Sequence, residues 1–122
     1  MMKKIILTVV VCSLSLLSTS AFSQIGYLKA KVKGTLVHDK DYGKCMARLD
    51  KDINTATDSP ECPTKWVSFS CEGTYNSKDI AYRKLDMAQS AEITQVDIIF
   101  SVDDTKKHDG HCFASRVESV TE

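Results

Sequence analysis

Most of the side chains that could do chemistry gather in one short stretch, residues 102–112, with the sequence VDDTKKHDGHC. Histidine and aspartate are common zinc ligands, and carboxylates also bind calcium. The candidate ligands are His108, His111 and Asp103, but their spacing matches neither an EF-hand loop nor two histidines one helical turn apart. Two lysines in the same stretch would also repel a cation. We therefore expect no metal and no other cofactor, with a histidine pH switch at about pH 6.5 as an alternative.

The same stretch has the pattern of a β-hairpin tip. Asp109-Gly110 is a dipeptide that tolerates positive φ in tight turns. Strand-like segments precede and follow it. The sequence therefore predicts a turn at this point rather than an active site.

Nucleophilic catalysis needs a nucleophile held next to an oriented base. The chain contains three histidines and no G-x-S-x-G motif. Its aspartate pairs, Asp39 with Asp41 and Asp103 with Asp104, fall in turn-like segments, and adjacent strand residues point to opposite faces. We expect no enzyme activity and assign no catalytic residue. The alternative is a metal-dependent or hydrolytic periplasmic enzyme that uses residues 103–111.

A stripe of lysines is the first feature suited to binding. In residues 25–38 apolar side chains alternate with Lys29, Lys31 and Lys33, so the lysines should share one strand face. Such a stripe can bind phosphate, sulfate or a carboxylated sugar. Its alternative role is to protect an edge strand from aggregation.

An aromatic residue is the second such feature. Trp66 alternates out of phase with its apolar neighbours, on the face that holds Ser68 and Ser70. A tryptophan exposed beside hydroxyl groups could stack on a sugar or anchor a protein partner, and Tyr82 could join either surface. The alternative is that Trp66 packs under the helix or under residues 51–63.

The start of the chain has the layout of a secretory signal peptide. Lys3 and Lys4 precede an apolar run, and Ala21 and Ser23 suit a cut before Gln24. The run is shorter than the roughly 20 residues of a membrane span. We expect a periplasmic or secreted bacterial protein with a single domain over residues 24–122 and no membrane span after cleavage.

The charge of the remaining chain disfavours nucleic-acid binding. Without residues 1–23, 14 basic side chains face 16 acidic ones. A nucleic-acid-binding domain needs a basic excess to neutralise phosphates. We therefore expect no nucleic-acid partner.

Four cysteines remain after signal cleavage, which in a small exported chain indicates two disulfides. No two of them are spaced as a C-x-x-C pair, so a zinc site is disfavoured. The four are Cys45, Cys62, Cys71 and Cys112. Three pairings are possible, and we favour Cys45–Cys62 with Cys71–Cys112. Regular strand alternation would place Cys112 on the other face from Cys71, unless a bulge near residues 109–110 intervenes.

The elements that must position these residues follow from periodicity. Strand patterns cover residues 25–38, 44–50, 64–73, 95–103 and 111–119, and a helix pattern capped by residues 76–77 covers about 78–92. Expected core positions are Ala81, Leu85 and Ala88, widened by Ile80, Met87 and Ala91, and in the strand after the helix Val96, Ile98, Phe100 and Val102. The order β-β-β-α-β-β predicts a β-rich α+β fold. An OB-like barrel is favoured over an open α+β sandwich.

Three segments carry a resemblance: WVSFSCEG, SKDIAYRKLDMAQSA and VDDTKKHDGHCFASRV. Together they resemble a family of short exported gamma-proteobacterial proteins, with an SK-x-x-AY helix and a DD-x-KKH-x-G-x-C hairpin. The resemblance implies export and transfers no catalytic residue. The architecture is also loosely similar to OB-fold toxin B subunits, which bind glycans as rings.

These observations favour a small exported binding or interaction module for a glycan, a cell-surface component or an exported protein. A homo-oligomer is compatible with that reading. The alternatives are the periplasmic enzyme described above and a structural assembly subunit.

Overall fold

The structure is a computed structural model that describes residues 25–120. Its strands are β1 (Ile25–Val37), β2 (Cys45–Leu49), β3 (Trp66–Ser68), β4 (Asp97–His108) and β5 (His111–Ser119), with helix α1 (Lys78–Thr94) between β3 and β4. The predicted order β-β-β-α-β-β is therefore confirmed. The signal-peptide prediction falls outside the described residues.

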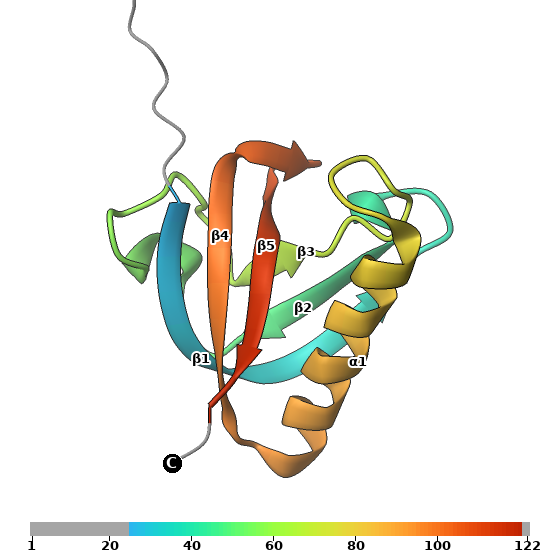
Figure 1. Cartoon of the computed structure of the whole chain (residues 1–122). Helices are drawn as coiled ribbons and strands as arrows, with labels where there is room; N and C mark the ends of the chain where they lie inside the picture. The colour runs from blue at the N-terminus through green and yellow to red at the C-terminus, as the bar shows by residue number, and fades with distance from the viewer. Residues whose placement is uncertain (1–24, 121–122) are drawn as a thin grey trace, which may run out of the picture.

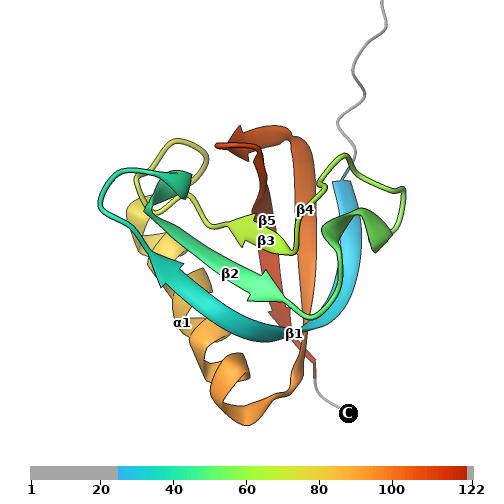
Figure 2. The ribbon, with the colours of Figure 1, turned by 180° about the vertical axis from the view of Figure 1, so that it is seen from behind.

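The five strands form one sheet that closes on itself in the order β1-β2-β3-β5-β4 (Figure 1). Neighbouring strands are antiparallel except β3 and β5, which pair in parallel through Ser68 and Phe113. β1 closes the ring because its first half pairs with β4 and its second half with β2 (Figure 2). The pairing with β2 shifts register between Val32 and Gly34, where a bulge bends the strand.

The strand alternation in β1 is as predicted. Its small and apolar side chains Leu28, Ala30 and Val32 are buried. Lys29 and Lys33 are exposed and Lys31 is half-buried, so the lysine stripe faces outward.

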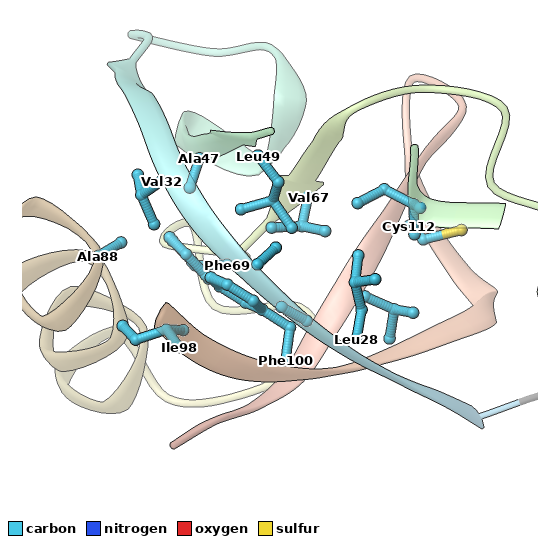
Figure 3. Close-up of a cluster of buried hydrophobic side chains, with 14 of the residues drawn as sticks. Leu28, Val32, Ala47, Leu49, Val67, Phe69, Ala88, Ile98, Phe100 and Cys112 are labelled. Carbon is cyan, nitrogen blue, oxygen red and sulfur yellow. The ribbon is translucent and has the colours of Figure 1, made fainter. Parts of the chain in front are cut away.

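The core fills the inside of the ring (Figure 3). Phe69 and Phe100 are its largest fully buried side chains. The polar connection between β2 and β3 also contributes to the core, because Ile53, Ala56 and Pro60 are buried within it. This connection therefore covers part of the core.

Helix α1 forms where its sequence pattern predicts. Ser77 is the N-cap, and its side chain accepts a hydrogen bond from the Ile80 amide. The buried helical positions are Ala81, Lys84, Leu85, Ala88 and Ala91. The predicted apolar stripe is too wide at one side, because Ile80 is 45% exposed. Val96 was expected inside but is 52% exposed, because it lies in the connection before β4.

The predicted turn at residues 109–110 is confirmed. Asp109 and Gly110 have φ of 51° and 84°, and they join β4 to β5 as a two-residue loop. β4 continues to His108, five residues beyond the predicted end at residue 103.

The predicted disulfide pairing is wrong. The bridges join Cys45 to Cys71 and Cys62 to Cys112, with Cα–Cα distances of 5.7 and 5.8 Å. β3 ends at Ser68, and the chain turns at residue 70, so Cys71 meets the start of β2 rather than β5. Cys112 points into the core, where the β2–β3 connection brings Cys62.

Within residues 25–120 there is no helix that is long and apolar enough to cross a membrane.

Candidate functional site

The three candidate metal ligands in residues 102–112 do not converge. The Asp103 carboxylate accepts hydrogen bonds from the amide and hydroxyl of Thr105, two residues along the same strand. His108 Nε2 lies 3.0 Å from Ser70 Oγ, whereas His111 Nδ1 lies 3.1 Å from Thr64 Oγ1. The described residues contain no group of three His, Cys, Asp or Glu side chains that could hold a metal ion.

A serine, a histidine and a glutamate do meet, although the sequence did not predict this cluster. His108 Nε2 is 3.0 Å from both Ser70 Oγ and Glu72 Oε1. In a catalytic triad the acid holds the other ring nitrogen, so this arrangement does not orient His108 as a base. Ser70 is also fully buried, so its hydroxyl is closed to substrate. No local motif predicts this cluster, because 38 residues separate Ser70 from His108.

The cluster stabilises the turn that follows β3. Ser70 Oγ donates to Glu72 and accepts a hydrogen bond from the Tyr75 amide. Burial raises the pKa of the Glu72 carboxyl, but hydrogen bonds from Ser70 and Thr74 and the nearby His108 outweigh it. The pKa of Glu72 is therefore below its usual value.

The expected exposed face with Trp66, Ser68 and Ser70 is not formed. Ser68 and Ser70 are both 0% exposed. The Ser68 hydroxyl donates to the Tyr42 carbonyl at 2.8 Å, because the turn before β2 folds over the end of β3. These serines therefore cannot bind a ligand beside Trp66.

Trp66 instead shares an outer face with the lysine stripe. Gly34 of β1, Arg48 of β2 and Trp66 of β3 lie opposite one another in register, and the flanking residues Ala47 and Val67 point inward. Arg48 is exposed and Trp66 half-buried. The Arg48 guanidinium donates to the Lys33 carbonyl at 3.3 Å and so connects Trp66 with the stripe.

We call this surface the basic face, and it comprises Lys29, Lys31, Lys33, Arg48, Lys51 and Trp66. Arg48 and Lys51 were not singled out from the sequence. A signal for Arg48 was available, because it alternates out of phase with the core residues Ala47 and Leu49. Lys51 donates to the Lys29 carbonyl at 2.8 Å, an interaction across 22 residues that no local pattern reveals. Tyr82 lies apart from these strands on α1 and is 45% exposed.

Positive charge dominates where the stripe meets β4. Lys31 Nζ donates to Asp97 at 3.0 Å. That hydrogen bond, with the charges of Lys31, Lys29 and Lys51, lowers the pKa of Asp97, and the same pairing raises the pKa of Lys31. Asp50 is a second carboxylate here, and its Oδ1 accepts a hydrogen bond from the Lys31 amide at 2.9 Å. Three ammonium groups thus face two carboxylates, and the remaining positive charge favours binding of a further anion.

No protein-family model, curated protein or solved structure matches this chain.

Proposed function

We propose that this protein is an exported binding module whose basic face holds an acidic oligosaccharide. The observation that carries the proposal is the row Gly34–Arg48–Trp66 beside Lys33. The indole would stack on a sugar ring, and the guanidinium and ammonium groups would contact carboxylate or sulfate groups. Gly34 has no side chain, and the Arg48 side chain lies over it, with Nε 3.6 Å from the position that a Cβ would occupy.

The strand order supports an OB-like interpretation of the fold. OB-folds are five-stranded barrels that bind oligosaccharides and oligonucleotides across the face of strands 2 and 3. Here the sheet closes in the order β1-β2-β3-β5-β4, with a helix after β3. Arg48 and Trp66 lie on β2 and β3, the strands that such a fold uses for ligands.

Two disulfides support a location outside the cytoplasm, since such bonds persist in oxidising compartments. We infer that residues 1–23 direct export. The ligand would then be a glycan of the periplasm or of a cell surface.

A fluorescence titration tests the proposal directly, because Trp66 is the single tryptophan of the chain. We expect dextran sulfate to change Trp66 emission and neutral dextran of the same length to leave it unchanged. Arg48→Gln should weaken dextran sulfate binding about tenfold, the loss expected for one charge-assisted hydrogen bond. Trp66→Ala, followed by calorimetry, should weaken it as well.

Lys78→Gln is the matched control, because it also removes one exposed positive charge but lies on α1. Equal losses for Arg48→Gln and Lys78→Gln would mean that net charge alone drives binding and would contradict a site. Binding of single-stranded DNA as tight as that of dextran sulfate would contradict recognition of a glycan.

A further inference from the structure

An apolar cavity with a volume of about 350 Å³ lies beside the last turns of α1. The ends of α1 and β5 and the start of β4 meet there, at the end of the ring that both ribbon views place opposite the β4–β5 turn (Figures 1 and 2). Its apolar wall is formed by Met87, Ala91, Val96, Ile98 and Val120. The volume falls within the range of small-molecule sites, about 300–1,000 Å³.

A second hollow, the lysine cavity, joins the apolar one. Its volume is about 420 Å³, and Lys29, Lys31 and Gln95 line it. Val96, Asp97 and Val120 line both cavities, so the two lie side by side. An apolar space therefore lies next to one that two lysines line.

The charges at this junction can accept an anion. Lys31 is paired with Asp97, and the Lys51 ammonium binds the Lys29 carbonyl. The Lys29 ammonium makes no hydrogen bond or ion pair with the residues that the structure describes. Asp86 lines only the apolar cavity and would repel an anion there. Asp97 lines both cavities, but Lys31 pairs with it, so an acidic group is favoured at the lysine end.

We propose that the two cavities together bind one single-chain anionic amphiphile. Its acyl chain occupies the apolar cavity, where it covers Val96, and its acidic headgroup contacts Lys29 and Lys31. The site is independent of the stacking row at Trp66 and shares only these two lysines with the basic face. A carboxylate and a phosphate headgroup have the same chemistry here, so fatty acids and lysophospholipids are the two sources.

Decanoate is the probe, and methyl carbon–proton spectra of the purified protein are the measurement. We expect saturable shifts at Met87, Ala91 and Val96. Each pair of methylenes removed from the chain should weaken binding on the order of tenfold. Octanoate should therefore bind more weakly than decanoate, and hexanoate more weakly still. If decyl phosphate binds more tightly than decanoate, the natural ligand is a lysophospholipid. If decanoate binds more tightly, it is a fatty acid.

Two variants separate the tail from the headgroup. Thr94→Trp places an indole in the apolar cavity from an exposed helix position and should abolish decanoate binding, and Ser90→Phe is a second filling variant should the first misfold. Lys29→Gln should weaken decanoate about tenfold and leave decanol unchanged. Unchanged decanoate binding in the filling variants would overturn the proposal.

The two ligand classes are distinguishable in the same set of proteins. Arg48→Gln should retain decanoate binding. Thr94→Trp should retain dextran sulfate binding, measured by calorimetry because this variant has a second tryptophan. Decyltrimethylammonium bound as tightly as decanoate would overturn the assignment of an anionic headgroup. Absence of methyl shifts with every amphiphile would overturn the site itself and leave the glycan proposal untouched.

Discussion

At the scale of single residues, one buried lysine makes the free energy of unfolding depend on pH. Lys84 is 8% exposed, and among the described residues its hydrogen-bond partners are an amide oxygen and a backbone carbonyl rather than a carboxylate. Its ammonium donates to Asn76 Oδ1 at 2.7 Å and to the Ala114 carbonyl at 3.0 Å, and it lies 4.6 Å from the centre of the Phe113 ring. Burial lowers the pKa of Lys84 from 10.5 to about 8.

This lowered pKa predicts that the free energy of unfolding rises with pH. Between about pH 8 and pH 10.5 the unfolded chain keeps the Lys84 proton and the folded chain releases it, so raising the pH favours folding across that window. Lys84→Met should lose this rise. Urea unfolding of both proteins from pH 7 to pH 10.5 measures it, and equal slopes would contradict the assignment.

At the scale of elements, two turns each contain a position whose backbone conformation favours glycine. The turn before β2 contains Gly43 with φ of +67°, and a Cβ there would lie 2.6 Å from Ser68 Oγ and 2.7 Å from His108 Cδ2. The turn between β4 and β5 contains Gly110 with φ of +84°, and a Cβ there would meet no atom within 4 Å. Both glycines adopt a left-handed backbone conformation, but only Gly43 also packs closely against neighbouring side chains.

These two glycines give a matched pair of substitutions. Gly110→Ala should cost about 1–2 kcal/mol, the strain of a left-handed alanine. Gly43→Ala should cost a further 1–3 kcal/mol or so, because the added methyl group overlaps buried atoms. Chemical denaturation measures both, and equal losses would show that the packing around Gly43 relaxes without cost.

At the scale of the whole molecule, closure of the sheet determines which cysteines pair. β2 and β3 are antiparallel neighbours, so the segment after β3 returns to the start of β2 and brings Cys71 to Cys45. The connection between β2 and β3 reaches the start of β5 and brings Cys62 to Cys112. The second bridge links positions 50 residues apart and ties the connection to the core.

Tryptic mapping without reduction tests this pairing cleanly, because each cysteine falls in its own peptide. We expect CMAR (45–48) linked to WVSFSCEGTYNSK (66–78), and DINTATDSPECPTK (52–65) linked to HDGHCFASR (108–116). A disulfide that links any of these four peptides to a different partner would contradict the topology of the closed sheet.

Much of the candidate site was visible in the sequence, because strand alternation is a local property. The outward lysines of β1 follow from a period of two, and Arg48 follows from the same rule applied to β2. The meeting of Arg48 with Trp66 was not visible, since it depends on the register between β2 and β3. The exposed serines were predicted wrongly, because a turn from elsewhere in the chain covers Ser68.

The sequence by itself determined the order of the elements, the cap of α1 at Ser77 and the turn at Asp109-Gly110. Each of these depends on neighbours within a few residues, through hydrogen bonds and backbone preferences. Only the tertiary structure decided the disulfide partners, the burial of Ser68 and Ser70, and the junction of the two cavities at Asp97. Those features depend on which distant segments the closed sheet brings together, and local patterns carry no information about that choice.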